Sequence, residues 1–105
     1  MKEWKLILPP DVEKDLNSFD KSQRAQITKT LIRVAKNPLP FTEGGYGKPL
    51  SGELSGCLKV KFRRLGIRVV YRLQRTEHGM EVIIVGMRAD NEVYSLAVER
   101  LKKRR

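Results

Sequence analysis

LKVKFR, residues 58–63, alternates strictly between apolar and basic side chains. Successive side chains of a β-strand point to opposite faces of its sheet. A strand here turns its three apolar side chains to one face and Lys59, Lys61 and Arg63 to the other. The pattern predicts a sheet that is apolar on one side and basic on the other, and such a face suits a polyanion.

Two more runs with strand character follow, over residues 68–75 and 81–87. Arg68 begins the first of them, and Arg72 lies in phase with it. Leu65-Gly66 and the Gly79 region carry turn residues between these runs. With a strand over 57–63, we expect a three-stranded antiparallel meander.

The residues before this meander predict one short strand and two helices. Residues 4–8 have the character of a short strand, with an apolar run over 6–8, and two prolines end it. Apolar residues then recur at helical spacing over 12–19 and over 27–35. Asp20 and Gln23 have the spacing of a capping box, which marks the start of the second helix. A last helix is expected after residues 90–91.

Residues 37–56 are rich in proline and glycine, so we expect a long connection without strand or helix. The predicted order is β-α-α-β-β-β-α within a single domain spanning residues 1–105. This is an α+β fold, a small antiparallel sheet with two N-terminal helices packed on it and a C-terminal helix. We expect the helices to cover the apolar face and the basic face to stay open.

The formal net charge of +10 on 105 residues indicates an anionic partner, either nucleic acid or an acidic protein. The positive charge is concentrated in the second half of the chain. A single cysteine allows no intrachain disulfide, which fits a reducing compartment. The apolar run before Pro9 is too short for a membrane span or a signal peptide. We expect a cytoplasmic protein without a membrane partner.

The side chains of the usual catalytic sets are scarce. His78, the one histidine, adjoins Gly79 in a predicted turn, and Cys57, the one cysteine, precedes an apolar run. We interpret the first as a turn residue and the second as a packing residue. One Cys and one His do not make a zinc site, and the acids are scattered. No metal and no cofactor are expected.

Lysine, arginine and tyrosine remain, and they suffice for one reaction. RNA cleavage beside a 2′-hydroxyl needs no metal, because the nucleophile belongs to the substrate. Cations stabilise the charge that develops on phosphorus, and neighbouring positive charges help a lysine to give up a proton. Tyr94 would stack on a base or share in proton transfer. From the residues alone, a solvated basic strand face is the competing interpretation.

Four segments resemble the RelE branch of the RelE/ParE toxins, which belong to type II toxin–antitoxin systems. They are KVK at 59–61, GIRVVY at 66–71, VGMR at 85–88 and EVY at 92–94. The resemblance covers nearly the whole chain, and the order of elements agrees. It implies a ribosome-dependent endoribonuclease that cleaves messenger RNA in the A site by 2′-hydroxyl attack, leaving a cyclic phosphate.

The resemblance also implies roles for five catalytic residues. The paired sheet lysines of the family fall on Lys59 and Lys61, and its transition-state arginine on Arg68. The arginine that assists the leaving oxygen falls on Arg88, and the stacking tyrosine on Tyr94. Beyond these, the basic residues expected to bind RNA or the ribosome are Arg63, Arg64, Arg72, Lys102, Lys103, Arg104 and Arg105.

Two alternatives stay open at the level of sequence. ParE-type relatives share the fold and inhibit DNA gyrase, and they typically lack this full basic-plus-tyrosine set. The other alternative is a non-catalytic module that binds RNA or the ribosome. Two features depart from the RelE pattern, namely Met87, where a basic residue is common, and the connection over 38–56.

The resemblance implies three partners: a cognate antitoxin, the ribosome and messenger RNA. We expect a monomer when the chain is free and a hetero-oligomer with the antitoxin. An antitoxin segment that folds on binding would either cover the basic residues or displace the C-terminal helix. Terminal helices are among the less stable parts of small domains, which favours displacement.

Overall fold

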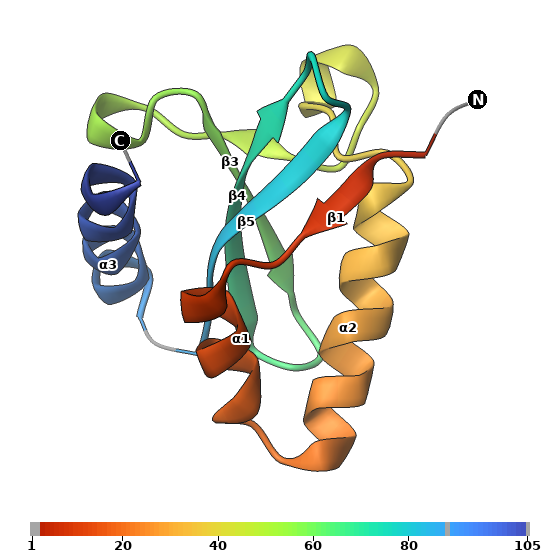
Figure 1. The fold of residues 1–105 in the computed structure, drawn as a ribbon, viewed down its shortest axis with the longest axis vertical. Helices are drawn as coiled ribbons and strands as arrows, with labels where there is room; N and C mark the ends of the chain where they lie inside the picture. The colour runs from red at the N-terminus through yellow and green to blue at the C-terminus, as the bar shows by residue number, and fades with distance from the viewer. Residues whose placement is uncertain (1–2, 88, 105) are drawn as a thin grey trace.

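The computed structural model describes residues 3–87 and 89–104. They form a mixed five-stranded sheet with helices on both of its faces (Figure 1). The helices are α1 (Pro10–Asn17), α2 (Lys21–Ala35) and α3 (Asp90–Lys103), with short 3-10 turns at Phe41–Glu43 and Gly52–Leu54. The strands are β1 (Lys5–Ile7), β2 (Lys48–Pro49), β3 (Cys57–Phe62), β4 (Ile67–Gln74) and β5 (Gly79–Gly86). The predicted α+β class is confirmed.

The strands lie in the order β1-β5-β4-β3-β2. The predicted antiparallel meander of β3, β4 and β5 is confirmed. The sheet is not purely antiparallel, however, because β1 pairs with β5 in parallel. A strand of three residues carries no local signal for the direction in which its neighbour runs. Hydrophobic periodicity therefore could not predict that β1 pairs with β5 in parallel.

The connection over 37–56 contains one strand and two short 3-10 turns, contrary to the prediction of neither strand nor helix. Lys48 and Pro49 pair with Lys59 and Leu58 at the edge of the sheet. Two residues are too few to show a period-two pattern, and a proline is tolerated in an edge strand because its missing N–H would face outward. The connection is also tied to the core, since the buried Tyr71 hydroxyl donates to the Pro38 carbonyl at 2.8 Å.

The two N-terminal helices begin where local chemistry predicts. Pro10 occupies the first turn of α1, where its missing N–H costs nothing. Asp20 caps α2 by accepting from the Gln23 N–H, and the Gln23 side chain accepts in return, so the predicted capping box is present. Both helices pack on one face of the sheet over the main core, which includes Val12, Leu16, Ile27, Leu31, Leu58, Val69, Tyr71, Met80 and Val82.

The opposite face is not left open as predicted, because α3 packs on it over β4 and β5 (Figure 1). Val93 and Ala97 of α3 are fully buried with Val70, Ile83 and Ile84 in a second core. The physical reason is visible in β5, whose residues from Gly79 to Val85 are all buried. Apart from the ion-paired Glu81, its side chains are apolar on both faces. Such a strand needs cover on both faces, whereas an alternating one needs it on one.

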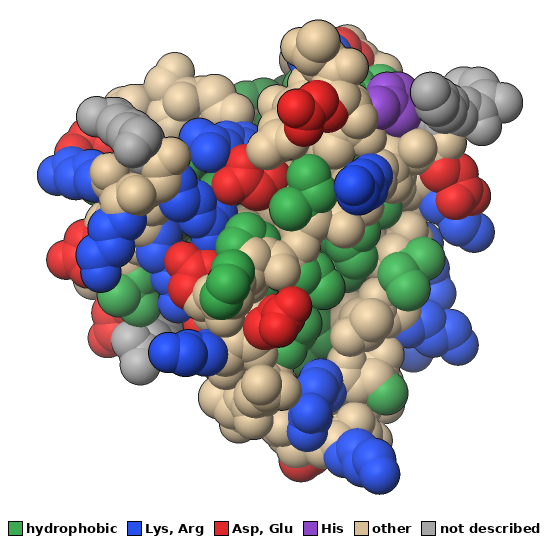
Figure 2. Space-filling view, viewed as in Figure 1, with side chains coloured by type: hydrophobic (Ala, Val, Ile, Leu, Met, Phe, Trp, Pro, Cys, Tyr) green, Lys and Arg blue, Asp and Glu red, His purple; other side chains and the backbone are tan. Residues whose placement is uncertain are grey.

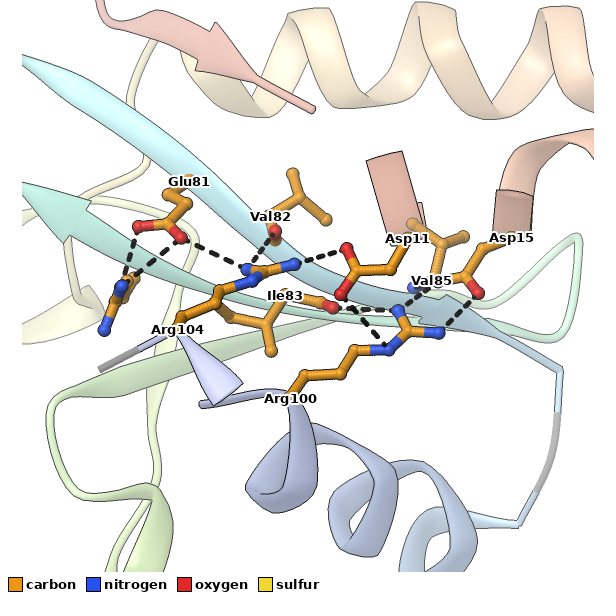
Figure 3. A network of polar contacts seen from close by, with 9 residues as sticks. Asp11, Asp15, Glu81, Val82, Ile83, Val85, Arg100 and Arg104 are labelled. Carbon is orange, nitrogen blue, oxygen red and sulfur yellow. Dashed lines mark hydrogen bonds and ion pairs between the residues drawn. The ribbon is translucent and has the colours of Figure 1, made fainter. Parts of the chain in front are cut away.

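The C-terminal half of α3 is held by ion pairs to α1 (Figure 3). The Arg100 guanidinium donates to both oxygens of Asp15, at 2.7 and 2.8 Å, and to the Ile83 carbonyl at 3.0 Å. Hydrogen bonding to Asp15 raises the pKa of Arg100, so its positive charge is secure. Asp15 also accepts from the Val85 N–H at 3.0 Å. These contacts join α1, β5 and α3.

Arg104 extends the same network to β5 (Figure 3). It donates to Asp11 of α1, and to Glu81 at 3.1 Å and the Val82 carbonyl at 3.0 Å. Burial alone would raise the pKa of Glu81. Hydrogen bonds from Arg72 and Gln74, with the charges of Arg72 and Arg104, outweigh burial and hold that pKa below its ordinary value.

The surface reflects the basic composition. On the side drawn in Figure 2, Lys and Arg side chains gather over α3 at the left and along α2 at the right. Hydrophobic side chains show between them, near α1 and β1. Within residues 3–87 and 89–104, no helix has the length and apolar character needed to cross a membrane.

Candidate functional site

Three of the predicted catalytic residues lie together on one face of the sheet. Lys59 and Lys61 are alternate residues of β3, so both point to the face opposite the main core. Arg68 of β4 is the direct cross-strand partner of Lys61. Directly opposite residues of an antiparallel pair share a face, and their Cβ atoms are about 5 Å apart. Strand pairing therefore brings two lysines and an arginine side by side.

Tyr94 completes this group from the first turns of α3. The Lys59 Nζ lies 5.6 Å from the centroid of the Tyr94 ring, within the range of a cation–π contact. The neighbouring Val93 and Ala97 are fully buried, so the docking of α3 fixes the tyrosine. The hydroxyl of Tyr94 is buried, and no hydrogen-bond partner for it is found among the described residues.

A fourth cation of this face was missed by the sequence analysis. Lys48 of β2 lies directly opposite Lys59, which places it on the same face. It also lines a groove of about 320 Å³ with Lys59, Lys61 and Arg63. No signal in the sequence marked Lys48, because the two-residue strand that carries it was taken as part of an irregular connection.

The remaining predicted binding residues fall into two groups. Arg63 and Arg64 are exposed after β3, and Arg63 lines the groove with the two lysines. Lys102 and Lys103 are exposed near the end of α3, and Lys102 makes a long contact, of 3.9 Å, with Glu53. All four side chains are accessible to a large anionic partner.

Arg72 and Arg104 are better assigned to the architecture than to RNA binding. Arg72 donates to Glu81 at 2.8 and 3.3 Å, and Arg104 pairs with Glu81 and Asp11. Only 14% of the Arg104 side chain is exposed. Their charges are needed inside the molecule, because Glu81 would otherwise be a buried, unpaired carboxylate. Arg88 and Arg105 lie outside the described residues.

The single cysteine and the single histidine have the structural roles expected of them. Cys57 is buried in the second core, and burial raises the pKa of its thiol, which makes it a poor nucleophile. His78 lies in the turn before β5 with a positive φ of 57°. Its ring stacks on Trp4, with centroids 4.0 Å apart.

The arrangement has the chemistry of a site for phosphodiesters. Lysine and arginine side chains stabilise charge on a phosphoryl group, and a positioned lysine or tyrosine carries a proton. An aromatic ring next to the cations offers a surface on which a base can stack. The fold and the basic face of the sheet together define a class of protein. Its members are small basic α+β proteins with a group of cationic side chains beside a C-terminal helix.

Comparisons with known proteins narrow this class. No family model matches the chain. The mRNA interferase toxin RelE of Escherichia coli K12 is 33% identical over 88 residues, which cover 84% of this chain and 86% of that protein. Among solved structures, a mutant of E. coli toxin RelE in the free state has a TM-score of 0.74 and 29% identity, covering 95% of this chain and 99% of that one. The same mutant in complex with an antitoxin RelB peptide has a TM-score of 0.68 and 28% identity, covering 91% and 95%.

Identity above 30% over most of both chains shows a common family, and the shared fold agrees with it. The chain belongs to the RelE-like toxins. The resemblance carried by the residues of β3, β4 and α3 is confirmed at the level of the family.

Proposed function

We propose that this chain is the toxin of a type II toxin–antitoxin system and a ribosome-dependent endoribonuclease that cleaves messenger RNA in the A site. The observation that carries the proposal is the grouping of Lys59, Lys61, Arg68 and Tyr94 on one face. These residues come from two strands and a helix, and they match the basic-plus-tyrosine set of the family. The relative of 33% identity is named an mRNA interferase toxin.

Each residue has a role in attack by the 2′-hydroxyl. Lys59 and Lys61 orient the scissile phosphate and carry the proton of the attacking hydroxyl. Arg68 stabilises the extra negative charge on phosphorus. Arg88 assists departure of the 5′-oxygen, and Tyr94 stacks on a base and shares in proton transfer. The reaction leaves a cyclic phosphate and a 5′-hydroxyl. The nucleophile and the leaving group both belong to the RNA.

The proposal includes an antitoxin as the regulating partner. Structures of related toxins exist in complex with RelB or a RelB peptide. A toxin with a net charge of +10 favours an acidic partner, and such a partner would neutralise the same face that binds RNA. The site of action is the cytoplasm, where translating ribosomes are found.

The test is to induce the chain in cells and to map the 5′-ends of messenger RNA. We expect cuts inside translated codons for the wild type and their loss for Arg68→Ala. Lys14→Ala is the control, since Lys14 is an exposed cation of α1, which packs on the opposite face of the sheet, and this variant should cut like the wild type.

Two results would contradict the proposal. Intact messenger RNA together with trapped gyrase–DNA complexes would favour the ParE-like function. Intact messenger RNA with tight ribosome binding would favour a non-catalytic module. If the Arg68→Ala variant still cleaves messenger RNA, the proposed reaction stands, but Arg68 is not the residue that stabilises its transition state.

A further inference from the structure

A groove at the edge of the sheet adjoins the proposed catalytic lysines. Its volume is about 320 Å³, and it is lined by Tyr46, Lys48, Lys59, Val60, Lys61 and Arg63. Four of these six side chains are cations and none is an acid. Two of the cations, Lys59 and Lys61, belong to the catalytic set, so whatever occupies the groove lies beside the reacting phosphate.

Tyr46 is exposed although it is a large aromatic residue. Its exposed fraction is 62%, among the highest of the large hydrophobic side chains of the described residues. The ring therefore contributes little to the core. A tyrosine held at the surface next to several cations has the composition of a stacking site for single-stranded nucleic acid, in which cations follow the backbone and a ring supports a base.

The backbone that presents Tyr46 is rigidly built. On one side, Gly45 packs so closely that an added Cβ would lie 2.0 Å from the Leu39 carbonyl oxygen. On the other, a Cβ at Gly47 would lie 2.4 Å from the buried Tyr71 hydroxyl. The Gly47 N–H donates to the Leu39 carbonyl at 3.1 Å. The backbone on both sides of Tyr46 is thus closely packed against the core. A side chain on such a fixed backbone loses less conformational entropy on binding than one on a mobile loop.

We propose that this groove is a second nucleotide subsite, in which a base of the RNA stacks on Tyr46 while Lys48 and Arg63 bind its phosphates. This rests on the proposed function, because the RNA is the substrate whose cleaved bond lies at Lys59 and Lys61. The subsite holds a nucleotide that flanks that bond. Tyr94 and Tyr46 would then each support one base. Lys59 lies between the two stacking positions, because it contacts the Tyr94 ring and also lines the groove with Tyr46.

An RNA strand fits the groove better than a protein segment does. A peptide that folds on binding gains affinity from apolar anchors in pockets. Val60 is the one aliphatic residue in the lining of this groove. Stacking on tyrosine together with phosphate contacts to Lys48 and Arg63 needs no such pocket.

The subsite is tested by the binding of a short single-stranded oligoribonucleotide to the free protein at low salt, measured by fluorescence anisotropy. We expect Tyr46→Ala to weaken this binding about tenfold, and Tyr46→Trp to preserve it. The rate of cleavage on ribosomes programmed with messenger RNA should fall with Tyr46→Ala in parallel. Phe41→Ala is the matched control, because Phe41 is 61% exposed in the same connection and does not line the groove.

Three other outcomes are informative. Two of them would overturn the subsite, and the third would retain the subsite but contradict the proposed nuclease function. Equal RNA binding by the wild type and Tyr46→Ala, or no binding by the wild type, would overturn it. Weakened binding of an antitoxin peptide with unchanged RNA binding would make the groove a protein site and also overturn it. If Tyr46 is needed for RNA binding but the wild type does not cut messenger RNA, the subsite stands and the proposed nuclease function falls.

Discussion

At Tyr94, the demands of packing differ from those of the catalytic role that we propose. Its hydroxyl is buried with no hydrogen-bond partner in the described part of the chain, while its ring lies against the Lys59 ammonium. A buried polar group without a partner costs stability, so a phenylalanine would pack at least as well. A hydroxyl at such a position agrees with the proton-transfer role proposed for Tyr94.

The Tyr94→Phe variant separates these two roles. We expect its free energy of unfolding to equal that of the wild type or to exceed it by about 1 kcal/mol. Cleavage should fall about a hundredfold, the size of a lost proton-transfer contribution. Chemical denaturation and single-turnover cleavage on programmed ribosomes measure the two quantities. A variant that is less stable than the wild type, or that cleaves as fast, would contradict this assignment of the hydroxyl.

At the scale of elements, α3 decides whether the site is complete. The helix places Tyr94 over Lys59, and its other end is held by Arg100 and Arg104. This anchoring runs against the expectation that a terminal helix is easily displaced. An antitoxin segment that takes the place of α3 has to supply a cation to Asp15, or it leaves a carboxylate of low exposure without its arginine. Glu81 would lose Arg104 but keep its pair with Arg72.

The anchoring of α3 can be measured with Arg100→Ala. Only 19% of the Arg100 side chain and 15% of the Asp15 side chain are exposed. Removing the arginine therefore leaves the largely buried Asp15 carboxylate without its cation. We expect a loss of about 2–4 kcal/mol in the free energy of unfolding. Hydrogen exchange should also quicken along α3. Lys102→Ala is the control from the same helix, and its exposed pair with Glu53 should be worth less than about 0.5 kcal/mol. Equal stability of the two variants would refute the anchoring role.

Glu81 makes this anchoring sensitive to acid. The pKa of Glu81 in the folded protein lies below the ordinary value of 4.5, so its contribution to stability is complete above that pH. The contribution is lost as the pH falls through the lowered folded pKa, because the unfolded state then binds the proton more readily. We expect the stability difference between the wild type and Glu81→Gln to be largest near neutrality and to shrink below about pH 4. Thermal melts of both proteins across this range are the measurement, and a constant difference would show that Glu81 does not titrate as inferred.

For the whole molecule, the net charge of +10 governs how it meets RNA. Phosphate contacts release counterions, so affinity for a short RNA should fall steeply with salt, with a slope of about −0.7 per phosphate contacted on a single strand. We expect Lys61→Ala to make this slope less steep by the amount that corresponds to roughly one phosphate contact. Lys14→Ala, an exposed lysine of α1, should leave the slope unchanged. A salt-independent affinity of the wild type would mean that charge does not hold the complex.

The features that could be predicted from the sequence are those set by contacts between near neighbours. Alternation in β3 placed Lys59 and Lys61 on one face, and Asp20 with Gln23 marked the start of α2. The meander followed as well, because short turns between strands leave few ways to pair them. These periods and caps involve residues at most a few positions apart, so local geometry decides them.

Other features depend on partners that lie far away along the chain. The parallel pairing of β1 with β5, the edge position of Lys48 and the covering of the second face by α3 have no local signature. The same holds for Arg104, which looks like one more basic tail residue until folding brings Asp11 and Glu81 to it. The sequence by itself determined that one strand face would be basic. Tertiary structure decided which cations stay on that face and which are used within the fold, because a charge is committed only when burial brings it an opposite charge.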